Sequence, residues 1–203
     1  KMIKLFHAKG SRSVRIIWLF EELGMDYQLD TVERGKPNKA FGEASIFAKI
    51  PAIQDGDITL TESVAIIQYI LQKYGGGGLQ PSVDSDDYAM YLQWLNFGES
   101  TLIQPIVEIL VNTMFRSEEN RHQYSIDSGI QSFKKIVQSL DPVLSQQNYL
   151  LGSQFSAADI VNGYTLRLAN RLQLLDDSEG IENVCDYFRR LEAREAYQKA
   201  ISI

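Results

Sequence analysis

Hydrophobic and polar residues alternate in two ways along the first 74 residues. A period of two over residues 3–7, 27–32, 51–54 and 58–60 predicts short β-strands, and an Asp-Gly turn predicts that the last two form an antiparallel hairpin. A period of three to four predicts two helices. The apolar positions of these helices are Ile16, Leu19, Phe20 and Leu23, then Val64, Ile67, Ile70, Leu71 and Tyr74. A β-α-β unit followed by β-β-α predicts a mixed four-stranded sheet with helices against it.

The rest of the chain has helical periodicity and no convincing strand. Four glycines and a proline between residues 75 and 82 indicate a domain boundary, with residues 75–85 as the linker. Helices are predicted over about 86–114, 117–140, 157–175 and 180–201. Residues 1–74 and 86–203 are therefore predicted to be an α/β domain and an all-helical domain.

Two motifs predict where helices of the second domain begin. Pro142 is expected to kink or restart its helix, and Asp141-Pro142 is typical of an N-cap followed by a proline in the first helical position. Ser156 and Asp159 form a capping box, in which each residue satisfies an N–H group of the other. A role for the same pair as catalytic partners is the alternative, and it is disfavoured because no histidine lies beside them in the sequence.

Composition and charge exclude several kinds of function. A hydrophobic share of 44% is ample for a core, while one cysteine and two histidines exclude disulfides and Cys-rich zinc sites and leave little material for a His-rich metal centre. The net charge is −6, divided as +1 over residues 1–74 and −7 over the rest. An acidic chain without a basic stripe is a poor nucleic-acid binder, and the first segment is the better host for an anionic ligand.

The chain has no signal-peptide pattern at its beginning and no apolar run near the ~18 residues that a membrane span requires. We therefore expect a soluble protein of a reducing compartment, the cytoplasm, with no membrane partner.

Three short segments of the first domain carry groups that bind charged or peptide-like ligands. Gly10–Ser13 lies at a strand-to-helix turn, where hydroxyls and the helix dipole stabilise an anion. Ile50-Pro51 opens a strand, and a cis bond there would turn the backbone of Ile50 toward a ligand. Glu62-Ser63 precedes a helix and can hold an ammonium group and a carboxylate. The three together are more informative than any one.

Each segment also has a purely structural interpretation. A serine at the first turn, or Ser63, can be an ordinary helix cap, and Pro51 fits the edge of a strand. The aromatic residues Tyr88, Tyr91 and Trp94 recur at helical spacing, which is typical of a core and also compatible with a ligand pocket. These alternatives stay open at the level of the sequence.

Four blocks occur in a specific order: GSRS at 10–13 with WLFEELG at 18–24, KIPAI at 49–53, LTESVAI at 60–66, and YLLGSQFSAADI at 149–160. With these blocks the whole chain resembles the cytosolic glutathione transferases, of the bacterial type with a serine in the active-site turn. The resemblance implies a thioredoxin-like, glutathione-binding domain and an all-helical domain. It also implies a homodimer that uses glutathione as co-substrate, with no metal or other cofactor.

For the sulfur of glutathione, the resemblance implies a contact with Ser11, with Ser13 in reserve because the turn permits an alignment shifted by one residue. Arg12 would point its charge at the same atom. The family's tyrosine type is not expected, because this chain has Phe6-His7 where the phenol would be. Arg12 also stands where the cysteine type needs its thiol.

For the rest of glutathione, the resemblance implies that Ile50, before a cis Pro51, pairs with the cysteinyl backbone. Glu62 and Ser63 would bind the γ-glutamyl end, and Lys49 would meet the glycyl carboxylate. Residues 45–48 depart from the family's usual Asn-Pro-x-Gly, which leaves the geometry of the loop before Ile50 open.

The expected reaction is conjugation of the glutathione thiol to a small hydrophobic electrophile, as in detoxification. A free thiol has a pKa near ~8.5, and a hydroxyl donor together with a helix dipole favours the nucleophilic thiolate. The electrophile would lie in an apolar cleft between the domains, lined by Tyr88, Tyr91 and Trp94. The alternatives are a non-catalytic protein that binds glutathione or a hydrophobic ligand, and a glutathione-dependent peroxidase.

Overall fold

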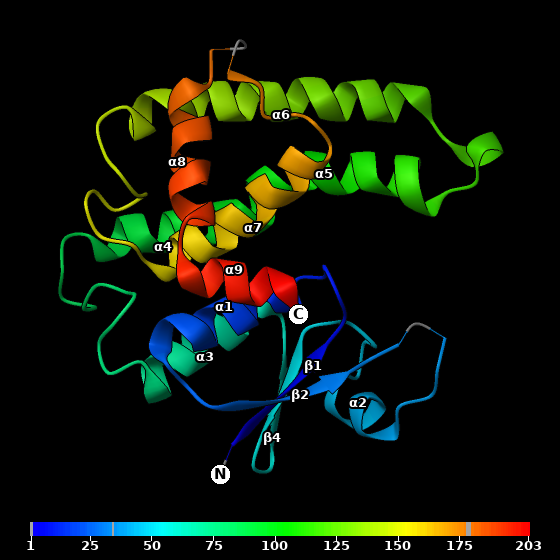
Figure 1. The fold of residues 1–203 in the computed structure, drawn as a ribbon, viewed down its shortest axis with the longest axis vertical. Helices are drawn as coiled ribbons and strands as arrows, with labels where there is room; N and C mark the ends of the chain where they lie inside the picture. The colour runs from blue at the N-terminus through cyan, green and yellow to red at the C-terminus, as the bar shows by residue number, and fades with distance from the viewer. Residues whose placement is uncertain (1, 34, 178–179) are drawn as a thin grey trace. The chain divides into compact units, whose positions relative to one another are not determined.

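The computed structural model describes residues 2–33, 35–177 and 180–203 (Figure 1). Its contacts form two compact units, one made of residues 1–82 with 192–203 and the other of residues 83–191. The elements of the first unit are β1 (Ile3–His7), α1 (Ser13–Leu23), β2 (Tyr27–Thr31), α2 (Lys39–Ala44), β3 (Ala52–Asp55), β4 (Ile58–Thr61), α3 (Ser63–Tyr74) and α9 (Glu195–Ser202).

The sheet of the first unit has the order β2-β1-β3-β4. Strands β1 and β2 are parallel, and β3 is antiparallel to both β1 and β4. Parallel strands need a crossover, which α1 supplies, whereas the Asp-Gly turn joins β3 directly to β4. The predicted mixed four-stranded sheet is confirmed, with thioredoxin-like and all-helical parts in the predicted order.

Helices cover both faces of this sheet. On one face, Phe6 and Ala52 pack against Ala44 of α2. Helices α1 and α3 lie side by side in Figure 1, on the other side of the strands from α2. The α1 segment from Ile16 to Phe20 is fully buried. Because strand side chains alternate between faces, β1 places alternate residues against α1 or α2.

The last helix belongs to the first unit, although the sequence assigned it to a second domain over residues 86–203. Helix α9 packs on α1, with the rings of Trp18 and Tyr197 edge to face at 4.9 Å between centroids. The difference has a simple cause: the apolar pattern of a helix shows that it has a buried face, and does not show what covers that face.

The second unit is helical in its described part, apart from two isolated bridges within residues 149–154. Its elements are α4 (Tyr88–Phe97), η1 (Gly98–Leu102), α5 (Ile103–Leu110), η2 (Val111–Phe115), η3 (Glu118–Asn120), α6 (Gln123–Leu144), α7 (Ala157–Arg171) and α8 (Glu182–Glu192). Among the residues that the structure describes, no helix is both long and apolar enough to cross a membrane.

The helix predicted over residues 86–114 contains two π-helical turns, η1 and η2. Pro105 has no N–H and its ring displaces the carbonyl four residues earlier, which falls in η1. Gly98 at the start of η1 lies so close to α7 that a Cβ there would be 2.8 Å from Val161 Cγ1. The first π-helical turn, η1, thus occurs where the helix is both interrupted by proline and packed closely against α7.

The N-cap predicted at Asp141 is wrong, because α6 runs through Pro142 to Leu144 with no new helix start. The Asp141 carboxylate instead serves α8: Oδ1 accepts from the Val184 N–H at 3.0 Å and Oδ2 from the Asn183 amide at 2.7 Å. An aspartate that caps a helix distant in the sequence leaves the same local pattern as one that caps its own.

The predicted capping box at the start of α7 is confirmed. Asp159 is fully buried, and its Oδ2 accepts from the N–H of Ser156 at 2.7 Å. Oδ1 accepts from the N–H of Leu150 at 3.0 Å and from the hydroxyl of Tyr187 at 2.8 Å. This carboxylate therefore joins α7, α8 and the loop before α7, which is a structural role.

Candidate functional site

The sheet register brings the three predicted ligand-binding segments to one end of the first unit. Phe6 pairs with Ala52, and Ala52 pairs with Thr61. One step further toward that end, the same ladder leads to the last residue of β1, to Pro51, and to Glu62. The turn before α1, the loop before β3 and the start of α3 thus meet at a single edge of the sheet.

The turn between β1 and α1 is closed by its own backbone. The Ser11 N–H donates to the Ala8 carbonyl at 3.1 Å, and Gly10 has φ +73°, a left-handed conformation that glycine adopts without strain. The Ser11 hydroxyl accepts from the Ser13 N–H at 3.3 Å, so it partly caps the helix. Arg12, at the N-cap position, makes no side-chain capping bond.

A chain of hydrogen bonds runs from this turn into the core. The hydroxyls of Ser11 and Ser13 are 2.7 Å apart, and Ser13 Oγ is 2.8 Å from His7 Nδ1. Ser11 is half-buried, Ser13 is fully buried, and His7 is 2% exposed. Of the two candidate serines, Ser11 is thus the one that a ligand can reach. Burial lowers the pKa of His7.

A buried arginine supports the start of α3, and no pattern in the sequence indicates it. Arg15 is fully buried in α1 and donates from Nη1 to the Ser63 hydroxyl at 2.9 Å. Glu62, just before Ser63, is exposed and has φ +68°, a left-handed conformation that costs a non-glycine residue energy. The start of α3 thus has an exposed carboxylate on a strained backbone at Glu62, and a buried guanidinium that donates to the next residue, Ser63.

The loop before β3 is closed by Ser45, which is buried. Its hydroxyl accepts from the Lys49 N–H and donates to the Lys49 carbonyl, both at 2.9 Å. This side chain closes the loop that lacks the family's usual sequence. The Ile50-Pro51 peptide bond is cis, and the Lys49 side chain is exposed.

The three aromatic residues predicted to line an electrophile pocket lie in the second unit. Tyr91 is 1% exposed and Trp94 is 9% exposed, whereas Tyr88 is half-buried and lies 6.0 Å from the Tyr91 ring. Trp94 also borders a cavity of about 350 Å³ between α4 and α6, together with Phe97 and Leu140. Their burial fits a core, and their contact with an electrophile stays a prediction.

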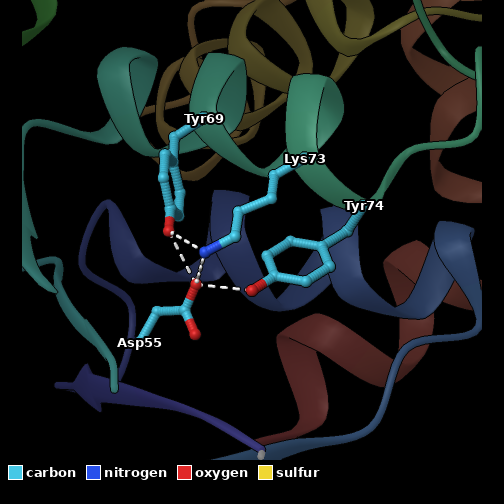
Figure 2. Close-up of polar contacts among 4 residues, drawn as sticks. All are labelled: Asp55, Tyr69, Lys73 and Tyr74. Atoms are coloured by element: carbon cyan, nitrogen blue, oxygen red, sulfur yellow. Dashed lines mark hydrogen bonds and ion pairs between the residues drawn. The ribbon is translucent and has the colours of Figure 1, made fainter. Parts of the chain in front are cut away.

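A second polar cluster lies at the opposite end of β3 (Figure 2). There, Asp55 accepts hydrogen bonds from Tyr69, Lys73 and Tyr74 of α3. Asp55 is the last residue of β3, whereas Pro51 precedes its first. This cluster fastens the β3–β4 hairpin to α3 and is separate from the candidate site.

The cysteine of this chain does not lie at the candidate site. Cys185 is buried in the second unit, and burial first, then the nearby Asp177, raises the pKa of its thiol to about 12. The residues described form no group of three or more His, Cys, Asp and Glu side chains able to hold a metal ion.

Comparison with known proteins gives consistent matches along the chain. The glutathione S-transferase N-terminal domain matches residues 5–78, and the glutathione S-transferase C-terminal domain matches residues 102–195. Glutathione S-transferase 3 of Schizosaccharomyces pombe is 32% identical over 78% of this chain and 70% of its own. Glutathione S-transferase GstA of Escherichia coli O157:H7 is 28% identical over 98% of each chain.

Solved structures show the same fold. The crystal structure of a glutathione transferase homologue from Lodderomyces elongisporus, which holds two glutathione molecules per subunit, matches with a TM-score of 0.87 at 21% identity. The match covers 100% of this chain and 98% of that one.

Proposed function

The chain belongs to the glutathione S-transferase family, and we propose that it conjugates glutathione to a small hydrophobic electrophile by binding the thiol as a thiolate. The observation that carries this proposal is the meeting of three segments at one edge of the sheet: the Ser11 turn, Ile50-Pro51 and Glu62-Ser63. Each carries groups suited to a different part of the tripeptide.

Ser11 is proposed to donate a hydrogen bond to the sulfur. Only a few per cent of a thiol with a pKa near ~8.5 is ionised at neutral pH. A hydrogen-bond donor that stabilises the thiolate therefore raises the amount of nucleophile. The start of α1 contributes the positive end of a helix dipole. The accessibility of Ser11 and the burial of Ser13 support Ser11 as the contacting residue and Ser13 as the group behind it.

The two ends of glutathione need charges of both signs. Glu62 suits the ammonium group of the γ-glutamyl end, and Ser63, backed by the buried Arg15, suits the carboxylate beside it. The backbone of Ile50 would pair with the cysteinyl residue. Lys49, exposed on the neighbouring loop, would meet the glycyl carboxylate.

The test is steady-state conjugation of glutathione to 1-chloro-2,4-dinitrobenzene. Wild-type protein is expected to turn over, and Ser11→Ala is expected to lower kcat/KM by about tenfold or more, because one hydrogen bond to a charged group is lost. Ser202→Ala is the matched control, since Ser202 is exposed in α9 and donates only to the Lys199 carbonyl.

Other outcomes would change the assignment. Calorimetric binding of glutathione without turnover of any electrophile would favour a binding protein, and turnover of a hydroperoxide alone would favour a peroxidase. If Ser11→Ala left turnover intact while Arg12→Ala abolished it, the contact with sulfur would belong to Arg12.

A further inference from the structure

His7 is the innermost group of the hydrogen-bond chain that ends at Ser11. The distances from His7 Nδ1 to Ser13 Oγ and from Ser13 Oγ to Ser11 Oγ are 2.8 and 2.7 Å. Ser13 Oγ also lies 3.4 Å from the Ala8 N–H and 3.3 Å from the Ala8 carbonyl. Whether these hydrogen bonds make Ser11 a donor or an acceptor toward a ligand depends on the direction in which their protons point.

One direction begins with a proton on His7 Nδ1. His7 then donates to Ser13, whose second lone pair accepts from the Ala8 N–H, and Ser13 donates to Ser11. Ser11 accepts from both the hydroxyl and the N–H of Ser13, which fills its two lone pairs. Its own O–H is then left for a ligand, so Ser11 is a donor.

The other direction begins with the proton on Nε2. Bare Nδ1 then accepts from the Ser13 hydroxyl, and Ser13 accepts from Ser11. The Ser11 proton is now used within the protein, and a lone pair faces the ligand instead. In this direction Ser11 can only accept, which suits a protonated thiol and offers nothing to a thiolate.

A thiolate is only an acceptor, so it is stabilised by the first direction alone. His7 is 2% exposed, and its burial lowers its pKa, which disfavours an imidazolium that would take up the thiol proton. Its surroundings therefore favour a neutral ring, which carries one N–H and one bare nitrogen.

We propose that His7 is a positioning residue whose Nδ1–H, acting through Ser13, turns the Ser11 hydroxyl toward the bound sulfur as a donor. The inference rests on the proposed function, since it concerns the same sulfur. It adds His7, which does not touch the ligand and determines whether Ser11, which does, acts as a hydrogen-bond donor or acceptor.

The test compares His7→Asn with His7→Gln. The asparagine amide can place an N–H near the position of Nδ1, whereas the glutamine amide reaches one carbon further, toward the position of Nε2. The readout is the pKa of the glutathione thiol in the complex, from the ultraviolet absorbance of the thiolate. His7→Asn is expected to keep most of the wild-type lowering, and His7→Gln to raise that pKa by about one unit, or about tenfold less thiolate at neutral pH.

Two further measurements separate positioning from a structural effect. S-methylglutathione has no thiol proton, so its affinity for both variants is expected to stay within about twofold of wild type. Ser13→Ala removes the hydroxyl that would take up the Ser11 proton, so it is expected to raise the thiol pKa less than His7→Gln does. The double variant is expected to match Ser13→Ala, because His7 acts through Ser13.

His122→Gln is the matched control. His122, the other histidine of the chain, also meets a serine through Nδ1, Ser125 at 3.0 Å, but is exposed on the second unit. The inference is overturned if His7→Gln keeps the wild-type thiol pKa, or if His7→Asn raises the thiol pKa as much as His7→Gln does. If the wild-type protein itself does not lower the thiol pKa, the proposed function fails instead, which is a distinguishable result.

Discussion

A single carboxylate oxygen collects three donors at the far end of the hairpin (Figure 2). Oδ2 of Asp55 accepts from the Tyr69 hydroxyl at 2.6 Å, the Lys73 ammonium at 2.8 Å and the Tyr74 hydroxyl at 2.5 Å. Its side chain is 8% exposed. The bond from Lys73 first, then those from the two tyrosines, lower the pKa of Asp55 to about 2.

This predicts an acid-dependent loss of stability. Because the pKa of Asp55 is lower in the folded protein than in the unfolded chain, its contribution is present above the unfolded pKa of ~3.9 and is lost as the pH falls toward 2. Asp55→Asn is expected to lower the free energy of unfolding by about 1 kcal/mol at pH 7. Urea unfolding should show this difference shrinking between pH 5 and about pH 2.

Asp57→Asn is the control for this prediction, because Asp57 lies in the same hairpin and is exposed. A difference between Asp55→Asn and wild type that did not change with pH would mean that the contacts of Asp55 do not depend on its charge.

At the scale of whole elements, α9 is held on α1 by packing and charge together. Arg194 donates from Nε and Nη2 to the two oxygens of Glu22 at 2.6 and 2.7 Å, a two-point contact that fixes orientation. Lys199 meets Glu21 at 2.5 Å. Between these pairs, Tyr197 is 1% exposed against Trp18. The last helix therefore completes the core of the first unit.

Tyr197→Ala is expected to lower the free energy of unfolding by about 3 kcal/mol, because it leaves a cavity against Trp18. Chemical denaturation followed by tryptophan fluorescence measures this loss. Tyr124→Ala is the control, since Tyr124 is 75% exposed, and its effect should stay within about 0.5 kcal/mol. Equal stability of the two variants would show that α9 is not part of the core.

At the scale of the molecule, the sequence predicted what local patterns determine. Strand alternation, the Asp-Gly turn and the capping box depend on residues a few positions apart, and the structure confirms all three. The three segments proposed to bind glutathione also follow from local turn chemistry, and their contact with a ligand stays a prediction. The sheet register that brings them to one edge follows from the order of the strands.

The predictions that failed, and the residues that were missed, depend on distant partners. Arg15 lies within an apolar helical pattern and meets Ser63, 48 residues away. Arg194 meets Glu22, 172 residues away, and Asp141 caps a helix that begins 41 residues later. His7 is different, because Ser13 is only six residues away, but the turn between β1 and α1 has to fold before Ser13 reaches it. No local motif carries that information.

The central claim is that the first unit binds glutathione and makes its thiol easier to ionise. The most direct measurement is an ultraviolet titration of the thiolate in glutathione bound to wild type and to Ser11→Ala. The wild-type complex is expected to have a thiol pKa at least about one unit below the free value of ~8.5, and the Ser11→Ala complex a value close to the free one. An unshifted thiol pKa in the wild-type complex, or the absence of a complex, would contradict it.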